Sequence, residues 1–340
     1  KKPLLILGSG AMMQANKAIQ LATAIHTLNI PVYLSGMARG LLGKNSALQL
    51  RHKRKEAIKD ADLIILAGVP NDFRLDYGNH IGSRKFIAIN RSKEDVFKNK
   101  KPTLSIVADP QDFLIELSTK YNGNFKNWLE HLAQRDAERE KNITLQANEQ
   151  LNKGINPLQL FQELEKKLSD NAILIADGGD FVATAAYTLQ PRSPLSWLDP
   201  GVYGTLGVGA GFALGAKLVY PEKEVYIIYG DGSAGYSLME YDTFKRLNLP
   251  VTSIIGTDAC WGQISRDQMD ILKSDCAMNL AYSDYQIIAN AFGGNGVRVE
   301  NINDFIQAIN DAKEANKNGV PFIINAIIGK SDFRKGSISV

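Results

Sequence analysis

Short apolar runs alternate with helix-length amphipathic segments along the chain, and this alternation constrains the fold more than any other feature. The first half contains the runs LLILGSG, PVYLSG, ADLIILAG, KFIAIN and TLSIVAD. The second half contains AILIADGGD, EVYIIYGDG, VTSIIGTD and PFIINAIIG. Apolar strands separated by helices are typical of parallel sheets with crossover helices. The sequence therefore predicts an α/β protein with two doubly wound domains.

The length of the chain also indicates two domains, since 340 residues exceed the usual extent of one hydrophobic core. Between the two halves, residues 127–154 are polar, charged and helical in pattern. We predict a first domain at 1–126, a helical connector at 127–154 and a second domain at 155–340. In doubly wound sheets, ligands bind at the carboxyl ends of the strands, so we expect the chemistry in the segments that follow them.

Composition narrows the classes of function. Lys and Arg number 39 against 36 Asp and Glu, and the net charge of +3 is too small to indicate a nucleic-acid partner. Two cysteines, Cys260 and Cys276, fit a reducing compartment. No run of 18 apolar residues occurs, so we expect a soluble, cytoplasmic chain as given. The chain starts in a strand without Met, which suggests a lost upstream segment and leaves an anchor or targeting signal there open.

The strand VYIIYG leads into Gly230-Asp231-Gly232-Ser233, and a helical pattern, SLMEYDTFKRL, follows. Backbone N–H groups and a carboxylate at the start of a helix suit a diphosphate that is bound through a divalent cation. A plain tight turn with Asp231 as a helix cap is the alternative, and GDG alone favours that alternative.

A second carboxylate follows the next strand. VTSIIGTD ends at Asp258, which lies 27 positions after Asp231 and therefore one helix and one strand further on. Mg²⁺ commonly combines one or two carboxylates with phosphate oxygens and water. The two aspartates thus predict a magnesium–diphosphate site, and a pair of loop aspartates without metal is the alternative.

The segment from Gly230 to Asp258 resembles the thiamine diphosphate (ThDP) motif, in which GDG precedes an Asn-Asn pair whose second member ligates Mg²⁺. Here the pair is Thr257-Asp258, so the spacing matches while the residues depart. The resemblance implies that Mg²⁺ is held by Asp231, Asp258 and the carbonyl oxygen of Cys260. An Asp in place of the usual Asn adds negative charge beside the diphosphate. The resemblance places beside the diphosphate Gly230, Gly232 and Ser233, together with the preceding loop residues Gly179, Asp180 and Phe181.

The segment Gly201–Gly215 contains six glycines, which let a backbone come close to a flat ligand. It is similar to the segment beneath the rings of ThDP. That similarity implies that the carbonyl of Gly204 accepts a hydrogen bond from the 4′-amino group of the cofactor. It also implies that Leu206 holds the cofactor in its bent shape. A glycine-rich helix packed tightly on a sheet is the alternative.

The whole chain resembles the acetolactate synthase-like branch of ThDP enzymes, and within it the 2-hydroxyacyl-CoA lyases. The likeness is carried by MARGLLGKN, AGVPNDFRLDYG, DGGDFVATAAY, TDACWGQISRDQ and SDFRKGSISV. Subunits of this branch consist of a pyrimidine-binding, a central and a diphosphate-binding domain. The resemblance implies that the pyrimidine-binding domain is missing here, together with the glutamate that activates the cofactor. We therefore expect no catalytic residue in this chain, which would be inactive alone as either a fragment or one subunit of a split enzyme. The expected working unit is a homodimer or homotetramer with that domain in cis or in trans.

Polar residues also lie near strand ends of the first domain. Gly8, Gly10, Asn71, Asp72 and Arg74 resemble those of a central domain that binds FAD or an ADP-containing nucleotide in relatives. The motif GSG lacks the full GxGxxG pattern. A purely structural central domain is the alternative.

The residues after Asp258 are expected to face substrate. The candidates for lining the substrate site are Trp261, Gln263, Ser265 and Arg266, and we expect the tail from Ser331 to close over a bound thioester. Acetolactate synthases place a Trp about nine positions after the metal-ligating Asn, where this chain has Asp267. The resemblance favours cleavage of a 2-hydroxyacyl-CoA to formyl-CoA and a shortened aldehyde. The alternatives are carboligation or decarboxylation of 2-oxo acids, and a non-catalytic protein with the same fold.

Overall fold

The computed structural model describes residues 1–334, and they divide into two compact units. The first unit contains Lys1–Asn142 and Pro191–Trp197, and the second contains Ile143–Gln190 and the described residues from Leu198 onward. The division falls inside helix α5 (Lys126–Ala147), which begins one residue before the predicted connector and ends inside it. Trp128 and Leu132 of α5 pack in the core of the first unit, whereas Ile143 and Ala147 pack in the second.

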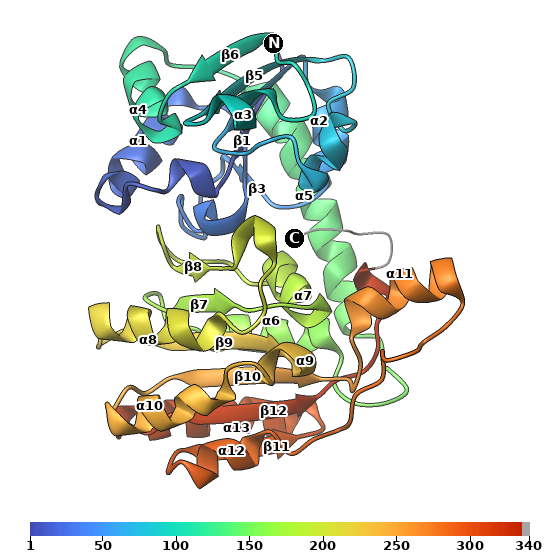
Figure 1. The fold of residues 1–340 in the computed structure, drawn as a ribbon. Helices are drawn as coiled ribbons and strands as arrows, with labels where there is room; N and C mark the ends of the chain where they lie inside the picture. Colours follow the sequence, from blue (N-terminus) through green and yellow to red (C-terminus); the bar gives the residue numbers. More distant parts are fainter. Residues whose placement is uncertain (335–340) are drawn as a thin grey trace. The chain divides into compact units, whose positions relative to one another are not determined.

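The first unit is built on a six-stranded parallel sheet in the order β3-β2-β1-β4-β5-β6. Its strands are β1 (Pro3–Leu7), β2 (Val32–Leu34), β3 (Gln49–Leu50), β4 (Leu63–Ala67), β5 (Lys85–Asn90) and β6 (Leu104–Val107). Its helices besides α5 are α1 (Ala18–Leu28), α2 (Arg54–Asp60), α3 (Lys93–Phe97) and α4 (Pro110–Lys120) (Figure 1).

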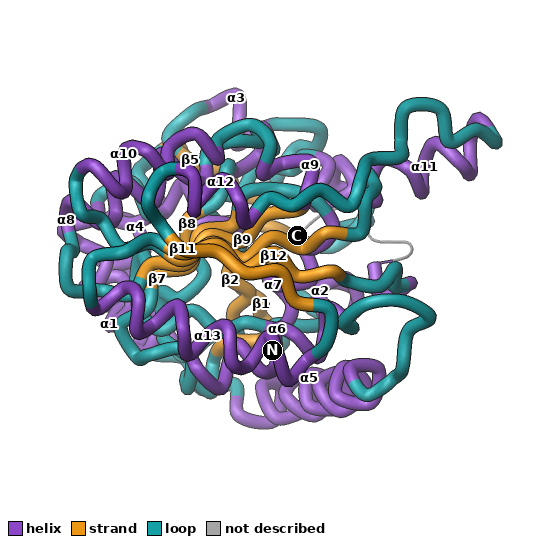
Figure 2. Tube along the Cα trace, turned by 90° about the horizontal axis from the view of Figure 1, so that it is seen from below, coloured by secondary structure: helices purple, strands orange, loops and turns teal. Residues whose placement is uncertain are grey.

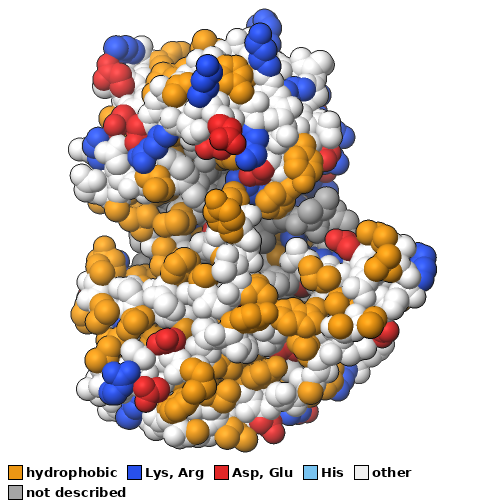
Figure 3. Space-filling model, in the orientation of Figure 1, with side chains coloured by type: hydrophobic (Ala, Val, Ile, Leu, Met, Phe, Trp, Pro, Cys, Tyr) orange, Lys and Arg blue, Asp and Glu red, His pale blue; other side chains and the backbone are white. Residues whose placement is uncertain are grey.

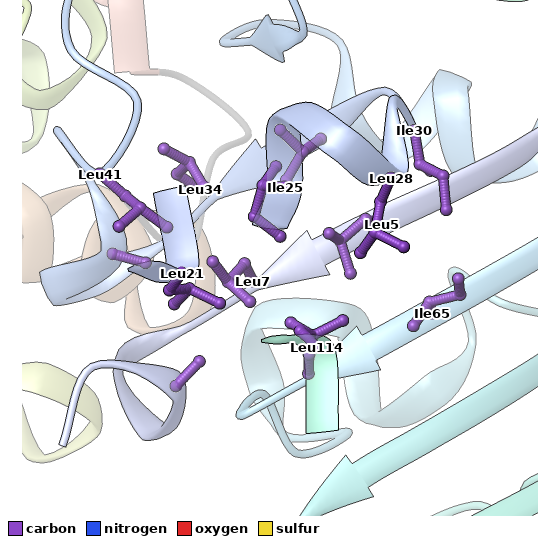
Figure 4. Close-up of a cluster of buried hydrophobic side chains, with 14 of the residues drawn as sticks. Leu5, Leu7, Leu21, Ile25, Leu28, Ile30, Leu34, Leu41, Ile65 and Leu114 are labelled. Carbon is purple, nitrogen blue, oxygen red and sulfur yellow. The ribbon is translucent and has the colours of Figure 1, made fainter. Parts of the chain in front are cut away.

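Alternate residues of β1 enter two different hydrophobic clusters. Leu5 and Leu7 pack with Ile25 of α1 and Leu114 of α4 (Figure 4). Leu4 and Ile6 belong to the other cluster, which includes residues of α2 and α5. Because both faces of the sheet are covered, both sets of side chains must be apolar, and the strand reads as a continuous apolar run.

The second unit contains a six-stranded sheet in the order β11-β12-β10-β9-β7-β8. Its strands are β7 (Ile173–Ala176), β8 (Trp197–Leu198), β9 (Val225–Gly230), β10 (Thr252–Thr257), β11 (Asn295–Val299) and β12 (Phe322–Ile327). Its helices are α6 (Pro157–Lys167), α7 (Asp180–Thr188), α8 (Gly209–Val219), α9 (Asp231–Ala234), α10 (Tyr241–Arg246), α11 (Gly262–Leu272), α12 (Gln286–Ala291) and α13 (Ile302–Lys317). Helices α8, α10 and α12 cover one face of this sheet, and α6 and α13 cover the other (Figure 2). The two parallel sheets confirm the predicted fold class.

The predicted helical segment SLMEYDTFKRL begins with a 3₁₀ turn, Leu238–Glu240, that runs directly into α10. It is separated from the short helix α9 at the GDG turn, which ends at Ala234. Gly235 has low helix propensity and follows the first turn directly. Among residues 1–334, none of the helices combines the length and apolar character needed to cross a bilayer.

Candidate functional site

The loops after β7, β9 and β10 meet at the carboxyl ends of these three strands. The N–H of Gly230 and the hydroxyl of Ser233 both donate to the carbonyl of Gly178, each at 3.3 Å. The N–H of Ala259, after β10, donates to Asp231 Oδ2 at 2.8 Å. The three post-strand segments singled out in the second domain therefore form one connected surface.

Two carboxylates lie close together on this surface. Asp231 is buried, and its carboxylate accepts hydrogen bonds from the N–H groups of Gly232 (2.9 Å) and Ala259 (2.8 Å). Burial raises the pKa of Asp231 to about 7, and the neighbouring Asp258 carboxylate adds to the rise. Burial also raises the pKa of Asp258, while the Lys330 ammonium opposes that rise.

This pair of donors fits a divalent cation. Asp231 is buried and Asp258 is half-buried, and the two carboxylates repel each other when both are ionised. A cation between them would remove that repulsion. In residues 1–334, no group of three or more His, Cys, Asp or Glu side chains is placed to hold a metal. A cation bound by Asp231 and Asp258 would thus complete its coordination with backbone, phosphate or water oxygens, which is the donor set that Mg²⁺ takes.

The turn that carries Cys260 is fixed on both sides. The N–H of Trp261 donates to the carbonyl of Met278, and the N–H of Leu280 donates to the carbonyl of Ala259, at 2.9 and 2.8 Å. Ala259 has a φ of +57°, a left-handed conformation that is strained for Ala and concentrates at functional sites. The segment 278–280 thus holds the turn on which the predicted third ligand, the carbonyl of Cys260, is located.

Asp177 was not among the predicted site residues, yet it holds the backbone of the glycine-rich segment 201–215 in place. Its buried carboxylate accepts from the N–H of Gly207 at 2.9 Å and from the N–H of Gly209 at 2.6 Å. Burial raises the pKa of Asp177, and these two hydrogen bonds oppose the rise. Leu206 packs on Gly178, where a Cβ atom would lie 2.2 Å from Leu206 Cδ2. The signal in the sequence that could have identified Asp177 is its position, since it is a polar residue directly after the buried strand β7.

The backbone at Gly179 and Gly204 has open space beside it. Both residues have a positive φ, of 100° and 58°, and a Cβ atom on either would meet no described atom within 4 Å. These are the positions at which the resemblance places the diphosphate and the aminopyrimidine ring. The geometry fits a cofactor that approaches the backbone closely.

Several other predicted residues contact the protein itself. The Phe181 ring is buried against Gly256 and lies 4.5 Å from the Phe161 ring, so only its backbone could face a cofactor. The Trp261 ring lies on Gly232, where a Cβ atom would be 2.4 Å from the ring. Trp261 therefore covers the GDG turn.

Arg266 and Asp180 form an ion pair. Arg266 Nη2 donates to Asp180 Oδ1 at 2.8 Å, and Nη1 contacts Oδ2. Arg266 lies on α11, as do Gln263 and Ser265, which are partly exposed. Helix α11 buries no residue and extends away from the sheet of the second unit in both views (Figures 1 and 2). The pair thus joins the diphosphate-side loop to the helix expected to face substrate.

The predicted tail is described only in part. In the 3₁₀ helix Asp332–Arg334, the Phe333 ring packs edge-on against the Tyr187 ring at 5.8 Å. The Arg334 guanidinium lies 5.0 Å from the centre of the same ring. The remaining tail, residues 335–340, lies outside the described part of the chain.

In the first unit, the residues expected to bind a nucleotide form hydrogen bonds and an ion pair within the unit itself. The N–H groups of Gly8 and Gly10 donate to the carbonyls of Ala67 and Gly68, at 3.0 and 3.2 Å. Asp72 forms an ion pair with Arg74 at 2.7 Å, and the side chain of Asn99 donates to the carbonyl of Asn71 at 2.7 Å. FAD or nucleotide binding by this unit stays a prediction.

Comparisons with known proteins agree with this geometry. Residues 1–117 match the thiamine pyrophosphate enzyme central domain, and residues 177–326 match the thiamine pyrophosphate enzyme C-terminal TPP binding domain. The chain is 46% identical to 2-hydroxyacyl-CoA lyase 2 of Danio rerio, over all of this chain and 56% of the relative. It is 30% identical to a probable acetolactate synthase of Mycobacterium bovis, over 97% of this chain and 60% of that protein.

A solved structure shows the same fold. The ThDP-dependent 4-hydroxybenzoylformate decarboxylase of Rhodococcus jostii RHA1 matches with a TM-score of 0.77 at 20% identity, covering 98% of this chain and 62% of that chain. The chain thus spans a little over half the length of the curated lyase it matches. The two domain matches confirm the resemblance drawn from the motifs: the chain belongs to the thiamine pyrophosphate enzymes and contains their central and C-terminal domains.

Proposed function

We propose that the protein is a ThDP- and Mg²⁺-dependent lyase that cleaves a 2-hydroxyacyl-CoA to formyl-CoA and an aldehyde shortened by one carbon. The observation that carries the proposal is the pair of neighbouring carboxylates, the buried Asp231 and the half-buried Asp258, at adjacent strand ends of a TPP-binding domain. The similarity to a protein named 2-hydroxyacyl-CoA lyase 2 supports this substrate class.

In this proposal, Mg²⁺ is held by Asp231, Asp258 and the carbonyl of Cys260. The diphosphate lies against Gly179, Asp180, the backbone of Phe181, Gly230, Gly232 and Ser233. Gly204 and Leu206 lie beneath the rings, and the Asp177 carboxylate fixes the backbone of that segment through Gly207 and Gly209. Bound ThDP supplies a nucleophilic carbon and an electron sink for breaking a carbon–carbon bond next to a carbonyl.

The protein's own contribution is binding, orientation and shielding from water. The Trp261 ring lies on Gly232 and so limits the access of water to the GDG turn. The Arg266–Asp180 pair holds α11 beside the diphosphate loop, where Gln263, Ser265 and Arg266 could orient a thioester. The segment 278–280 keeps the Cys260 turn in one conformation.

We further propose that a pyrimidine-binding domain, in cis or in trans, supplies the glutamate that activates the cofactor, within a homodimer or homotetramer. The chain alone would then be inactive. The proposal is supported by apolar side chains exposed on the second unit, shown in orange in Figure 3. They include Tyr203, Leu218, Val219, Tyr236 and Met239. Such apolar surface is typical of contacts between proteins.

Acetolactate synthase-type carboligation or decarboxylation of 2-oxo acids is the second candidate, and the 30% identity to a probable acetolactate synthase favours it. Both reactions would use the same cofactor residues. One residue weakens this second candidate: Asp267 stands where acetolactate synthases are expected to have a Trp. Asp267 is exposed on α11. A non-catalytic protein would have no need for paired carboxylates at the motif spacing.

Product analysis of the full-length protein separates these reactions. The protein is supplied with ThDP and Mg²⁺ and then with either a 2-hydroxyacyl-CoA or pyruvate, and the products are identified by mass spectrometry. We expect formyl-CoA and a shortened aldehyde. Acetolactate from pyruvate would establish the second candidate instead, and the absence of both products would contradict the lyase proposal.

A further inference from the structure

A buried hydrogen-bond network adjoins Asp258. Thr257, the last residue of β10, is fully buried, and its hydroxyl donates to Asn325 Oδ1 at 2.7 Å. Its carbonyl accepts from the N–H of Ile328 at 3.0 Å. Both the side chain and the backbone of the residue before Asp258 are thus bound to the end of β12.

Asn325 connects this strand end to a second segment. It lies within β12 and is fully buried among apolar residues such as Ile324 and Ala326. Its amide nitrogen donates to the carbonyl of Ser283 at 2.9 Å and to Gln286 Oε1 at 2.8 Å. Burying an amide costs free energy unless protein hydrogen bonds replace those to water. The hydrogen bonds of Asn325 therefore hold the end of β10 and the start of α12 in a defined geometry.

The segment that Asn325 binds continues from the residues that hold the chain just after Asp258. Ser283 and Gln286 lie three and six positions after Leu280, and residues 278–280 bind the backbone of Ala259 and Trp261. The network therefore fixes the residue before Asp258 directly and the residues after it through one short stretch of chain. A purely apolar residue at position 325 would pack in the sheet but would form neither connection.

We propose that Thr257 and Asn325 are positioning residues that hold Asp258 and the carbonyl of Cys260 at the distances a magnesium ion requires. This inference rests on the proposed function. Mg²⁺ accepts only near-octahedral ligands at about 2.0–2.1 Å, so a small shift of a ligand weakens binding strongly. Residues that orient metal ligands typically contribute about 10- to 100-fold in metal affinity.

The same strand offers a matched control. Thr252, at the opposite end of β10, is also fully buried, and its hydroxyl accepts from Asn316 Nδ2 at 2.7 Å. Thr252→Val and Thr257→Val thus each remove a Thr–Asn hydrogen bond of the same length from the same strand. Only the second removes it next to Asp258.

The test measures how the binding of ThDP to the full-length protein depends on Mg²⁺ concentration, by isothermal titration calorimetry at fixed ThDP. We expect Thr257→Val to raise the half-saturating Mg²⁺ concentration about tenfold or more. Thr257→Ser, which keeps the hydroxyl, and Thr252→Val should stay within about twofold of the wild type. Urea unfolding of each variant reports stability separately.

The outcomes are distinguishable. If Thr257→Val changes the Mg²⁺ dependence no more than Thr252→Val does, the network only stabilises the fold and the inference is wrong. If Thr257→Val does not fold, Gln286→Ala removes one partner of Asn325 at a partly exposed position and should weaken Mg²⁺ binding in the same direction. An unchanged Mg²⁺ dependence in Gln286→Ala would overturn the inference. A wild type whose ThDP binding does not depend on Mg²⁺ would overturn the proposed function as well.

Discussion

The two units contain similar parallel sheets but differ in how they use glycine at the strand ends. In the first unit, a Cβ atom on Gly68 would lie 2.4 Å from the backbone nitrogen of Ala11, and one on Gly8 would lie 2.4 Å from Val69. In the second unit, a Cβ atom on Gly179 or Gly204 would meet no described atom within 4 Å. Open space beside a glycine therefore shows where a ligand can approach the backbone, whereas filled space, as also at Gly178 of the second unit, shows packing.

The units also differ in how they balance carboxylates. Asp72 of the first unit is paired with Arg74 at 2.7 Å, and both side chains are 11% exposed. In the second unit, the buried Asp231 and the half-buried Asp258 lie near each other. Asp72 is thus neutralised by a side chain of its own unit, whereas Asp231 and Asp258 together place negative charge where a divalent cation would offset it.

The largest expected effect comes from removing a proposed metal ligand. Asp258→Ala should weaken Mg²⁺-dependent ThDP binding more than about 100-fold, because it removes a ligand rather than shifting one. Asp258→Asn keeps an oxygen donor and should retain binding. Asp72→Ala, in the first unit, should leave ThDP affinity unchanged. Equal ThDP affinity of the wild type and Asp258→Ala in calorimetry would refute the ligand role.

Alanine at a packed and at an open glycine should separate stability from binding. Gly68→Ala should lower the free energy of unfolding by about 2–4 kcal/mol, since it combines a left-handed φ of +67° with a backbone clash. Gly179→Ala should cost only about 1–2 kcal/mol of stability for its positive φ but should abolish tight ThDP binding. Urea denaturation and calorimetry measure the two quantities. If Gly68→Ala weakens ThDP binding as much as Gly179→Ala, the contrast between the units is wrong.

The stability of the metal-free protein should depend on the Asp231 carboxyl. Its pKa is raised to about 7 in the fold from 3.8, so between these values the folded state keeps a proton that the unfolded state has lost. The stabilisation from the protonated Asp231 carboxyl is therefore fully present below about pH 4 and is lost as the pH rises to about 7. Over this range the free energy of unfolding should fall by roughly 2–4 kcal/mol.

Asp231→Asn should remove this part of the pH dependence. The measurement is the difference between wild type and Asp231→Asn in urea unfolding with EDTA, at a series of pH values from 4 to about 8. Mg²⁺ with ThDP should reduce the loss at high pH in the wild type. Parallel curves for the two proteins would show that Asp231 does not titrate differently in the fold.

The smallest effect should come from the ion pair between Asp180 and Arg266, whose side chains are 23% and 25% exposed. Partly exposed pairs contribute about 1 kcal/mol or less, so Arg266→Gln should change the free energy of unfolding by no more than that. Arg74→Gln should destabilise the protein more, because it leaves the better buried Asp72 without its partner. The reverse order in urea denaturation would contradict the expected difference between these pairs.

Strands that are buried on both faces could be predicted from the sequence, and three of the four edge strands could not; the fourth, β6, was predicted because it lies in the run TLSIVAD. Buried strands such as β1 and β4 appear as apolar runs. Strand β11 reads NGVRV, is only partly buried at the edge of its sheet, and was missed. Strands β3 and β8, each of two residues, are too short for any periodicity and also lie at sheet edges.

The candidate site could be predicted from the sequence where a motif specifies the spacing of its residues. Asp231 and Asp258 follow strands at the spacing of the motif, which places them together. Asp177 was missed because no motif links it to its partners, Gly207 and Gly209. The bond between Thr257 and Asn325 depends on the pairing of β10 with β12, which no local pattern specifies.

The central claim is that the second unit binds the diphosphate of ThDP through a divalent cation at Asp231 and Asp258. The most direct test is a calorimetric titration of the full-length protein with ThDP, in the presence of Mg²⁺ and again after EDTA treatment. We predict saturable binding with Mg²⁺, its loss in EDTA, and its return when Mg²⁺ is added back. Equal ThDP affinity with and without the cation, or no binding under either condition, would contradict the claim.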